Sequence, residues 1–372
     1  MSTKTQDLAA VVEAANFPAD GRDLQVSPTA SFDDLLHKVR QAGLMDYRPG
    51  YFAVKIALNV VLSAAGWVAF ALLGNSWWQL AVAVWIGLCF VQTGFIAHDT
   101  GHKQISRARK TQDVLGWIHM NVLLGVSFGW WVNHHNRHHS NPNNLDKDPD
   151  TVRRQVIFAP SEYARKAHTP FRRFVIRHQA VMFFVLLMQE AFRMHKAGFT
   201  AARAGLLRIP VMELGLLMVH FTAYLVAVFT VLDPGLGVVF ILVNQAVFGI
   251  YLGAVFAPNH KGMAVHRDDV EVDWLHRQVL TSRNIYSSRF TDFMYGGLNY
   301  QIEHHLFPSM PRVNLRRARP LVREYCAAHG VPYHEVSQAR SYLEVARHLR
   351  EVSVSTRARI SEVLREMERA KA

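Results

Sequence analysis

The chain has 372 residues, half of them hydrophobic, and its formal net charge is +12 at pH 7. Its two cysteines exclude the disulfide framework of a small secreted domain and suit a reducing compartment. A strongly basic chain can bind nucleic acid, a membrane surface or an anionic substrate. The long apolar runs of this chain favour a membrane surface or an anionic substrate as the partner of its positive charge, so we expect no nucleic-acid partner.

Residues 1–50 are expected to form an N-terminal cytoplasmic region outside the membrane. Residues 1–30 are polar and lack the apolar core of a signal peptide, which predicts a flexible tail. Residues 32–44 repeat apolar side chains at helical spacing. This pattern predicts an amphipathic helix that lies on the protein body or on the membrane surface.

Four apolar stretches each approach the roughly 20 residues that a helix needs to cross a bilayer. They cover residues 51–73, 77–97, 211–232 and 235–257. Only residues 74–76 join the first pair, and only residues 233–234 join the second. The pattern therefore predicts an all-α, multi-pass integral membrane protein with four spans arranged as two hairpins.

The basic residues predict how the spans are oriented. Seventeen Lys and Arg lie between residues 98 and 210, 18 lie after residue 257, and the two hairpin links contain none. Basic segments of membrane proteins tend to stay on the cytoplasmic side. We therefore expect both termini, the long middle loop and any active site beside it to be cytoplasmic.

Histidines are concentrated in three short motifs and at one further position. The motifs "HDTGH", "HHNRHH" and "QIEHH" space histidines by three or four residues, which places them on one face of a helix. A lone histidine follows the fourth span, as the first motif follows the second span. The eight candidate metal ligands are His98, His102, His135, His138, His139, His260, His304 and His305.

Eight imidazoles exceed the ligands that one ion needs, so the pattern favours two metal ions. Imidazole binds Fe, Zn, Cu and Ni, and spacing alone does not select among them. Because the motifs stand where spans leave the membrane, we expect an acyl chain or another long hydrocarbon as substrate. Breaking its unactivated C–H bonds needs an oxidising metal, which favours iron with O₂ over zinc.

The uncharged stretch 114–131 is long enough to cross the membrane. A crossing would place the first two histidine motifs on opposite sides, so we expect the stretch to dip and return or to lie along the interface. Residues 181–188 are too short to span and are expected to form a similar embedded helix. Trp117, Trp130 and Trp131 then suit an interface or the wall of an acyl tunnel.

The motifs "HDTGH", "HNRHH" and "QIEHHLFP" resemble the three histidine boxes of the membrane fatty acid desaturases, and the resemblance covers most of residues 50–320. The box that begins with glutamine is similar to that of the front-end branch. The resemblance implies a helical cytoplasmic cap, two iron ions held by the eight histidines, and O₂ as co-substrate. It also implies that a cis double bond is inserted into an acyl-CoA or an acyl lipid.

Polar residues beside the boxes are candidates for orienting the metal ligands or for contacting the substrate. Gln301 stands where other members have histidine, and we expect it to hydrogen-bond a ligand or a bound water, or to ligate weakly. Asp99 and Glu303 are expected to orient neighbouring ligands. Four basic residues either contact substrate phosphates or act only as a topology signal, and these are Lys103, Arg107, Arg109 and Lys110.

The desaturase domain is expected to cover residues 51–320, and a charged helical tail residues 321–372. The HPGG motif of a fused cytochrome b5 domain does not occur, so we expect a separate electron donor: a ferredoxin, a cytochrome b5 or a reductase. The nearest alternative function is a lipid or carotenoid hydroxylase or ketolase on the same scaffold. A zinc-dependent membrane hydrolase is the alternative from a different class.

Overall fold

A computed structural model describes residues 27, 29–152, 155–267 and 272–371. Within these residues the chain is mostly helical, and its one sheet pairs two strands of two residues each. The flexible tail predicted for residues 1–30 lies almost wholly outside the described residues.

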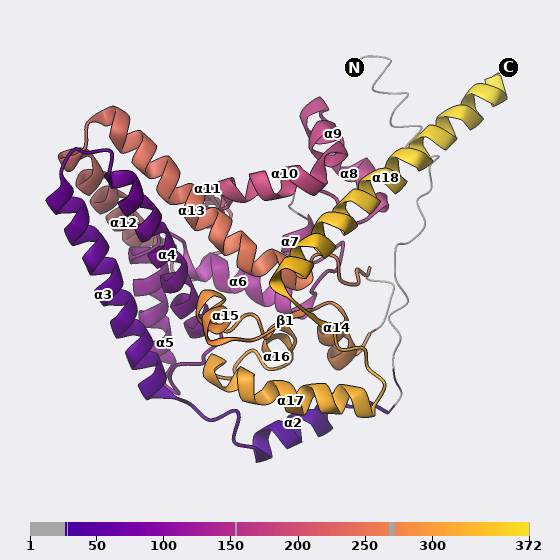
Figure 1. Cartoon of the computed structure of the whole chain (residues 1–372), viewed down its shortest axis with the longest axis horizontal. Coiled ribbons are helices and arrows are strands. Elements are labelled where there is room, and N and C mark those ends of the chain that lie inside the picture. Colours follow the sequence, from indigo (N-terminus) through magenta and orange to yellow (C-terminus); the bar gives the residue numbers. More distant parts are fainter. Residues whose placement is uncertain (1–26, 28, 153–154, 268–271, 372) are drawn as a thin grey trace.

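Four long apolar helices confirm the predicted membrane spans. They are α3 (Pro49–Leu73), α4 (Gln79–Gly101), α12 (Pro210–Val231) and α13 (Pro234–His260), and each is long and apolar enough to cross a membrane. Three of them begin with proline, whose missing N–H has no helical partner in the first turn anyway. The four helices lie together on one side of the molecule (Figure 1).

The C-terminal ends of two spans, α4 and α13, differ from the prediction. Helix α4 continues to Gly101 and helix α13 continues to His260. His98 and His260 therefore lie inside the last turns of these helices and not beyond them. Both turns are buried, and a continued helix satisfies backbone groups that water does not reach.

The two hairpins contact each other along their length. At the links, the backbone N–H of Asp233 donates to Asn75 Oδ1 at 3.0 Å. In the middle, a Cβ at Gly87 would lie 2.9 Å from the carbonyl oxygen of Asn244, so α4 and α13 approach backbone to backbone. Both links therefore lie at the same end of the bundle.

The stretch 114–131 forms no single helix. It is divided among α5 (Arg109–Gly116), a π-helical turn (Trp117–Val122) and α6 (Phe128–Ser140). The chain reverses at Gly125, whose φ of 68° is readily adopted by glycine. This agrees with a segment that returns, but Trp130 and Trp131 belong to α6 and not to the returning part.

A second group of short helices precedes the third span. It comprises α9 (Pro170–Arg177), α10 (Gln179–Leu186), the 3₁₀ turn η3 (Leu187–Gln189) and α11 (Glu190–Arg203). The chain bends by 107° between α9 and the helices that follow it. The predicted embedded stretch, residues 181–188, lies in α10 and η3.

The remaining elements form a cap at one end of the spans. They are α2 (Phe32–Gln41), α7 (Pro149–Val152), η2 (Pro160–Glu162), α8 (Tyr163–Lys166), α14 (Trp274–Leu280), β1 (Asn284–Ile285), α15 (Arg289–Met294), α16 (Gln301–Leu306), α17 (Arg312–Ala328), β2 (Glu335–Val336) and α18 (Gln338–Lys371). The boundary predicted at residue 320 falls inside α17. Helix α18 packs on α10 and projects from the body at its C-terminal end (Figure 1).

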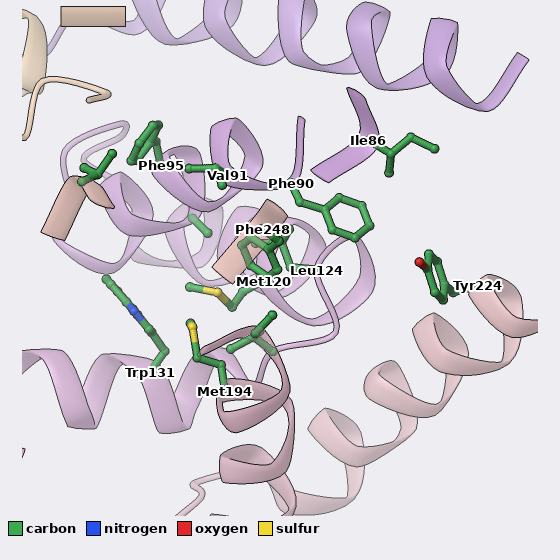
Figure 2. Close-up of a cluster of buried hydrophobic side chains, with 14 of the residues drawn as sticks. Ile86, Phe90, Val91, Phe95, Met120, Leu124, Trp131, Met194, Tyr224 and Phe248 are labelled. Carbon is green, nitrogen blue, oxygen red and sulfur yellow. The ribbon is translucent and has the colours of Figure 1, made fainter. Parts of the chain in front are cut away.

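The largest apolar core lies where the spans meet the returning segment and α11. Figure 2 shows Met120, Leu124, Met194 and Phe248 gathered between these elements, with Trp131 beside them. Since Met120 and Leu124 belong to the returning segment, Met194 to α11 and Phe248 to α13, this core fixes the returning segment against the bundle.

We predict that Gly249→Ala destabilises the protein by about 1–3 kcal/mol, the usual range for overpacking. A Cβ at Gly249 would lie 2.4 Å from the carbonyl oxygen of Leu187, so α13 and η3 would have to separate. Thermal unfolding of the purified protein in detergent measures the effect. Gly215→Ala is the matched control, because a Cβ there meets nothing within 4 Å. Equal melting temperatures for the two variants would contradict the packing.

Candidate metal centre

All eight candidate histidines converge where the spans meet the cap, and each is buried. Four elements supply them: the ends of α4 and α13, and the helices α6 and α16. The spacing of three and four residues works as expected on α6, where three rings share one face. Helix α16 adds two adjacent rings from a single short element.

The rings form two groups whose nitrogen atoms lie within 4.8 Å of one another inside each group. The first group contains His98, His102, His135 and His304, and the second contains His138, His260 and His305. In the second group, His138 Nε2 lies 3.2 Å from His260 Nε2. Two adjacent groups match the expectation of two metal positions.

The eighth histidine lies between the two groups. His139 Nε2 is 3.1 Å from His135 Nε2 of the first group. Its ring also stacks on His305 of the second group, with 4.1 Å between ring centroids. His139 can therefore serve either position, and the eight rings form one continuous cluster.

Burial sets the charge state of this cluster. It lowers the pKa of His102 to about 3, and it also lowers the pKa values of His135, His139, His304 and His305. Nearby imidazolium charges would lower them further. The rings are therefore neutral at pH 7, which is the form that binds metal ions.

His138 is the exception within the cluster. Burial lowers its pKa, but the neighbouring carboxylates of Asp148 and Asp150 outweigh burial, and the pKa is raised. His138 Nδ1 lies 3.1 Å from Asp148 Oδ1, and Asp148 is fully buried. The carboxylate therefore holds the Nδ1 proton and directs Nε2 into the cluster, as in carboxylate–histidine–metal arrangements.

Two more rings are oriented by groups outside the cluster. His260 Nδ1 lies 3.0 Å from the carbonyl oxygen of Thr281, and His305 Nδ1 lies 2.9 Å from Gln278 Oε1. The Gln278 amide also donates to the carbonyl oxygen of His139 at 2.9 Å. The roles of Gln278 and Thr281 could not be predicted from the sequence, because no spacing pattern marks these residues.

The acidic turn after the second motif, residues 141–150, also supports the site. Asp148 accepts hydrogen bonds from the backbone N–H groups of Asn143 and Asp150, at 2.9 and 2.8 Å. It therefore supports the turn and the His138 ring together. The signal available in the sequence was an acidic turn directly after a histidine motif.

Gln301 lies at the edge of the second group. Its Nε2 is 2.9 Å from His260 Nε2, and its Oε1 accepts from Asn259 Nδ2 at 3.0 Å. Asn259 also donates to the carbonyl oxygen of Leu298 at 2.9 Å, which fixes its own orientation. The amide N–H₂ of Gln301 is therefore directed at the cluster.

The two predicted acidic neighbours have different surroundings. Asp99 Oδ1 lies 3.7 Å from His98 Nδ1, and its Oδ2 forms a buried ion pair with Arg312 Nε at 3.2 Å. Glu303 instead accepts from Asn284 and Tyr333, each at 2.8 Å, on the side of the strands. Burial raises the pKa of Glu303 to about 7. Asp99 thus adjoins a ring, whereas Glu303 holds α16 against β1.

Several ring nitrogens have no hydrogen-bond partner among the described residues. They are both nitrogens of His304, His102 Nε2, His139 Nδ1 and His305 Nε2. A buried polar atom without a partner costs roughly 1–3 kcal/mol. Metal coordination would satisfy the nitrogens that face the groups, so the donor set fits a bound metal pair.

A largely apolar cavity runs from the cluster into the core shown in Figure 2. Near the rings it is lined by Trp130 and Trp131, and deeper by Met120, Leu124 and Phe248. Charged side chains line it as well, namely Asp150, Glu190, Arg193 and Lys261. An apolar space that begins at the histidines suits one end of a hydrocarbon chain.

The other predicted substrate residues lie away from this cavity. Lys103, Arg107, Arg109, Lys110 and Trp117 are absent from its lining among the residues that the structure describes. The four basic side chains are exposed. Arg107 lies over the ring of Tyr47, and Arg109 pairs with Asp113 at 3.8 Å. Contact between these side chains and substrate stays a prediction.

Four apolar spans carrying a buried histidine cluster at one end define a membrane protein with a site able to hold metal ions. The family model described as Fatty acid desaturase matches residues 75–337, and the chain belongs to this family.

Three relatives illustrate the similarity. An acyl-lipid (9-3)-desaturase of Physcomitrium patens is 32% identical over 82% of this chain and 59% of its own length. A Delta(5) fatty acid desaturase of Caenorhabditis elegans is 30% identical over 82% of this chain and 69% of its own length. A Delta(8)-fatty-acid desaturase of Borago officinalis is 26% identical over 87% of this chain and 75% of its own length. The chain thus spans less than two thirds of the Physcomitrium protein.

We predict that Asp148→Asn weakens metal binding about 10–100-fold, the usual cost of losing a group that orients a ligand. Titration with a chelator, followed by metal analysis, measures the retained metal. Asp146→Asn is the control, because Asp146 is exposed and pairs with Arg267 at 3.1 Å. If both variants release metal at the same chelator concentration, Asp148 does not support the site.

Proposed function

We propose that the protein is an O₂-dependent fatty acyl desaturase that inserts a cis double bond into an acyl-CoA or an acyl lipid. The observation that carries the proposal is the pair of buried histidine groups at the mouth of an apolar cavity. Membership of the desaturase family supports the same reaction.

Two iron ions fit the donor set best, because the reaction needs a metal that changes its oxidation state. The first group of four histidines would hold one ion, the group of three would hold the other, and His139 would complete either position. Bound iron would supply the oxidising power that removes two hydrogen atoms from adjacent carbons, while O₂ takes up these hydrogens, two electrons and two protons to form two waters. The protein's own contribution is to hold the ligands and to position the chain.

The cavity would position the acyl chain. Trp131 packs edge-on against His98, with 5.5 Å between ring centroids, and Phe256 lies 6.2 Å from the same ring. These aromatic walls would keep water from the reacting carbons and align the chain beside the first group. The name of the Physcomitrium relative supports an acyl lipid as the carrier of that chain.

We further propose that the termini and the metal centre are cytoplasmic and that a separate ferredoxin, cytochrome b5 or reductase supplies the electrons. The basic segments adjoin the cap, whereas the uncharged link 74–76 and residues 233–234 lie together at the other end of the bundle. The division into residues 1–50, 51–320 and 321–372 is part of this proposal.

The amide of Gln301 could either orient a group in this centre or bind the metal itself. We predict that Gln301→Ala retains both irons but lowers turnover about 10–100-fold, because the amide would orient a group bound beside His260 and would not bind the metal itself. Iron per protein and double-bond formation, located by mass spectrometry of the lipids, are measured together.

His304→Ala is the comparison, since it removes a ligand and should abolish desaturation in a protein that still inserts. Loss of iron in Gln301→Ala would make the glutamine a ligand. One zinc and no iron in the parent protein would reject the desaturase proposal, and a hydroxylated or oxidised product would favour the alternative oxidation on the same scaffold.

The orientation is tested with single cysteines in right-side-out membrane vesicles. A cysteine at Asn75, which is exposed in the link, should react with an impermeant reagent, whereas a cysteine at the exposed Arg109 should react only after permeabilisation. The native Cys89 and Cys326 are buried and serve as an internal background. Reaction at Arg109 in sealed vesicles would reverse the topology.

A further inference from the structure

A second cavity lies on the opposite side of α4 from the metal centre. It is a groove between α3 and α4, the two spans of the first hairpin. Helix α3 contributes Lys55, Leu58 and Leu62, which are spaced by three and four residues and therefore form one stripe. A matching stripe on α4 includes Leu88 and Gln92. The catalytic cavity is instead bordered by other positions of α4, and the two cavities share no lining residue.

The groove has two different ends. At one end the indole Nε1 of Trp85 donates to the carbonyl oxygen of Leu62 at 2.9 Å and closes the space between the helices. At the other end Lys55 meets Phe293 of α15. Since a helix rises 1.5 Å per residue, the stripe from Lys55 to Leu62 is about 10 Å long. This length fits a segment of one acyl chain.

Polar groups in the floor of the groove are satisfied inside the protein. The hydroxyl of Thr93 donates to Asn59 Oδ1 at 2.9 Å, and Asn59 Nδ2 donates to the carbonyl oxygen of Cys89 at 3.3 Å. Gln92 donates to the hydroxyl of Tyr251 at 2.9 Å. The groove therefore needs no polar occupant along its length, and its exposed wall is hydrocarbon from Leu58 and Leu88.

The cation at the open end lacks an acidic partner. Lys55 Nζ lies over the rings of Tyr51 and Phe293, at 5.6 and 5.3 Å from their centroids, and no carboxylate of the described residues forms an ion pair with it. Arg312, which also lines the groove, already pairs with Asp99 at 3.2 Å. A lysine near the end of a span extends toward the lipid headgroups, where anionic phosphates gather.

From this arrangement we infer a binding site for one anionic phospholipid, with its phosphate at Lys55 and one acyl chain in the groove between α3 and α4. Because α3 and α4 are membrane spans, lipid surrounds the groove. The unpartnered charge favours an anionic headgroup over a zwitterionic one. The site goes beyond the proposed desaturation and does not depend on it.

Native mass spectrometry of the whole protein in a neutral detergent tests the site. The probes are phosphatidylglycerol and phosphatidylcholine with identical acyl chains. We expect one phosphatidylglycerol to be retained more strongly than phosphatidylcholine. Lys55→Met should weaken phosphatidylglycerol about fivefold, the effect of one basic contact at a membrane surface, without changing phosphatidylcholine. Lys55→Arg should restore the preference.

Two further variants make the result decisive. Arg208→Met removes an exposed cation just before α12, away from the groove, and should leave phosphatidylglycerol retention unchanged. Leu58→Trp should fill the groove and weaken both lipids while the charge remains. Equal retention of the two lipids by the parent protein, or equal losses in Lys55→Met and Arg208→Met, would overturn the site. Metal content is measured in every variant. If Leu58→Trp loses metal but retains both lipids as strongly as the parent protein does, the lipid site would also be overturned.

Discussion

The structure depends on bringing eight imidazoles to one buried place. Each ring nitrogen that is removed from water must find a partner, and several have none within the described protein. Such an arrangement is costly in itself and becomes favourable when metal ions supply the missing partners. The surrounding helices therefore act as a scaffold that holds the rings in position, excludes water from them and fixes their orientation. This constraint explains why two spans continue past the expected membrane boundary and end at ligands.

The support for the rings comes from a small number of fixed polar groups. Asp148, Gln278 and the carbonyl group of Thr281 each hold the Nδ1 side of one ring, so that Nε2 faces the cluster. Gln278 connects α14 to two ligands at once. Truncating Asp148 or Gln278 would change the direction of a ring without changing the number of ligands. The two histidine groups and the polar groups that orient their rings should therefore be regarded as one unit.

Sequence patterns predicted the parts of the fold that depend on local periodicity. The four spans, the two hairpins and the histidine spacing follow from hydropathy and from the helical repeat. The orienting partners did not follow, since Gln278 and Thr281 meet the rings only after the chain has folded. Glu303 shows a different limit. It is two residues from Gln301 on a helix, roughly 200° around the axis, so it faces away from the side that Gln301 presents.

The ion pair between Asp99 and Arg312 has a consequence for biosynthesis. It joins the first histidine motif to the beginning of α17, and these positions are separated by more than half of the chain. A ribosome would thus have inserted all four spans before the partner of Asp99 emerged. His304 and His305 emerge only shortly before it. Complete metal positions can consequently exist only after all four spans have been inserted, so metal loading would follow insertion and would not guide it.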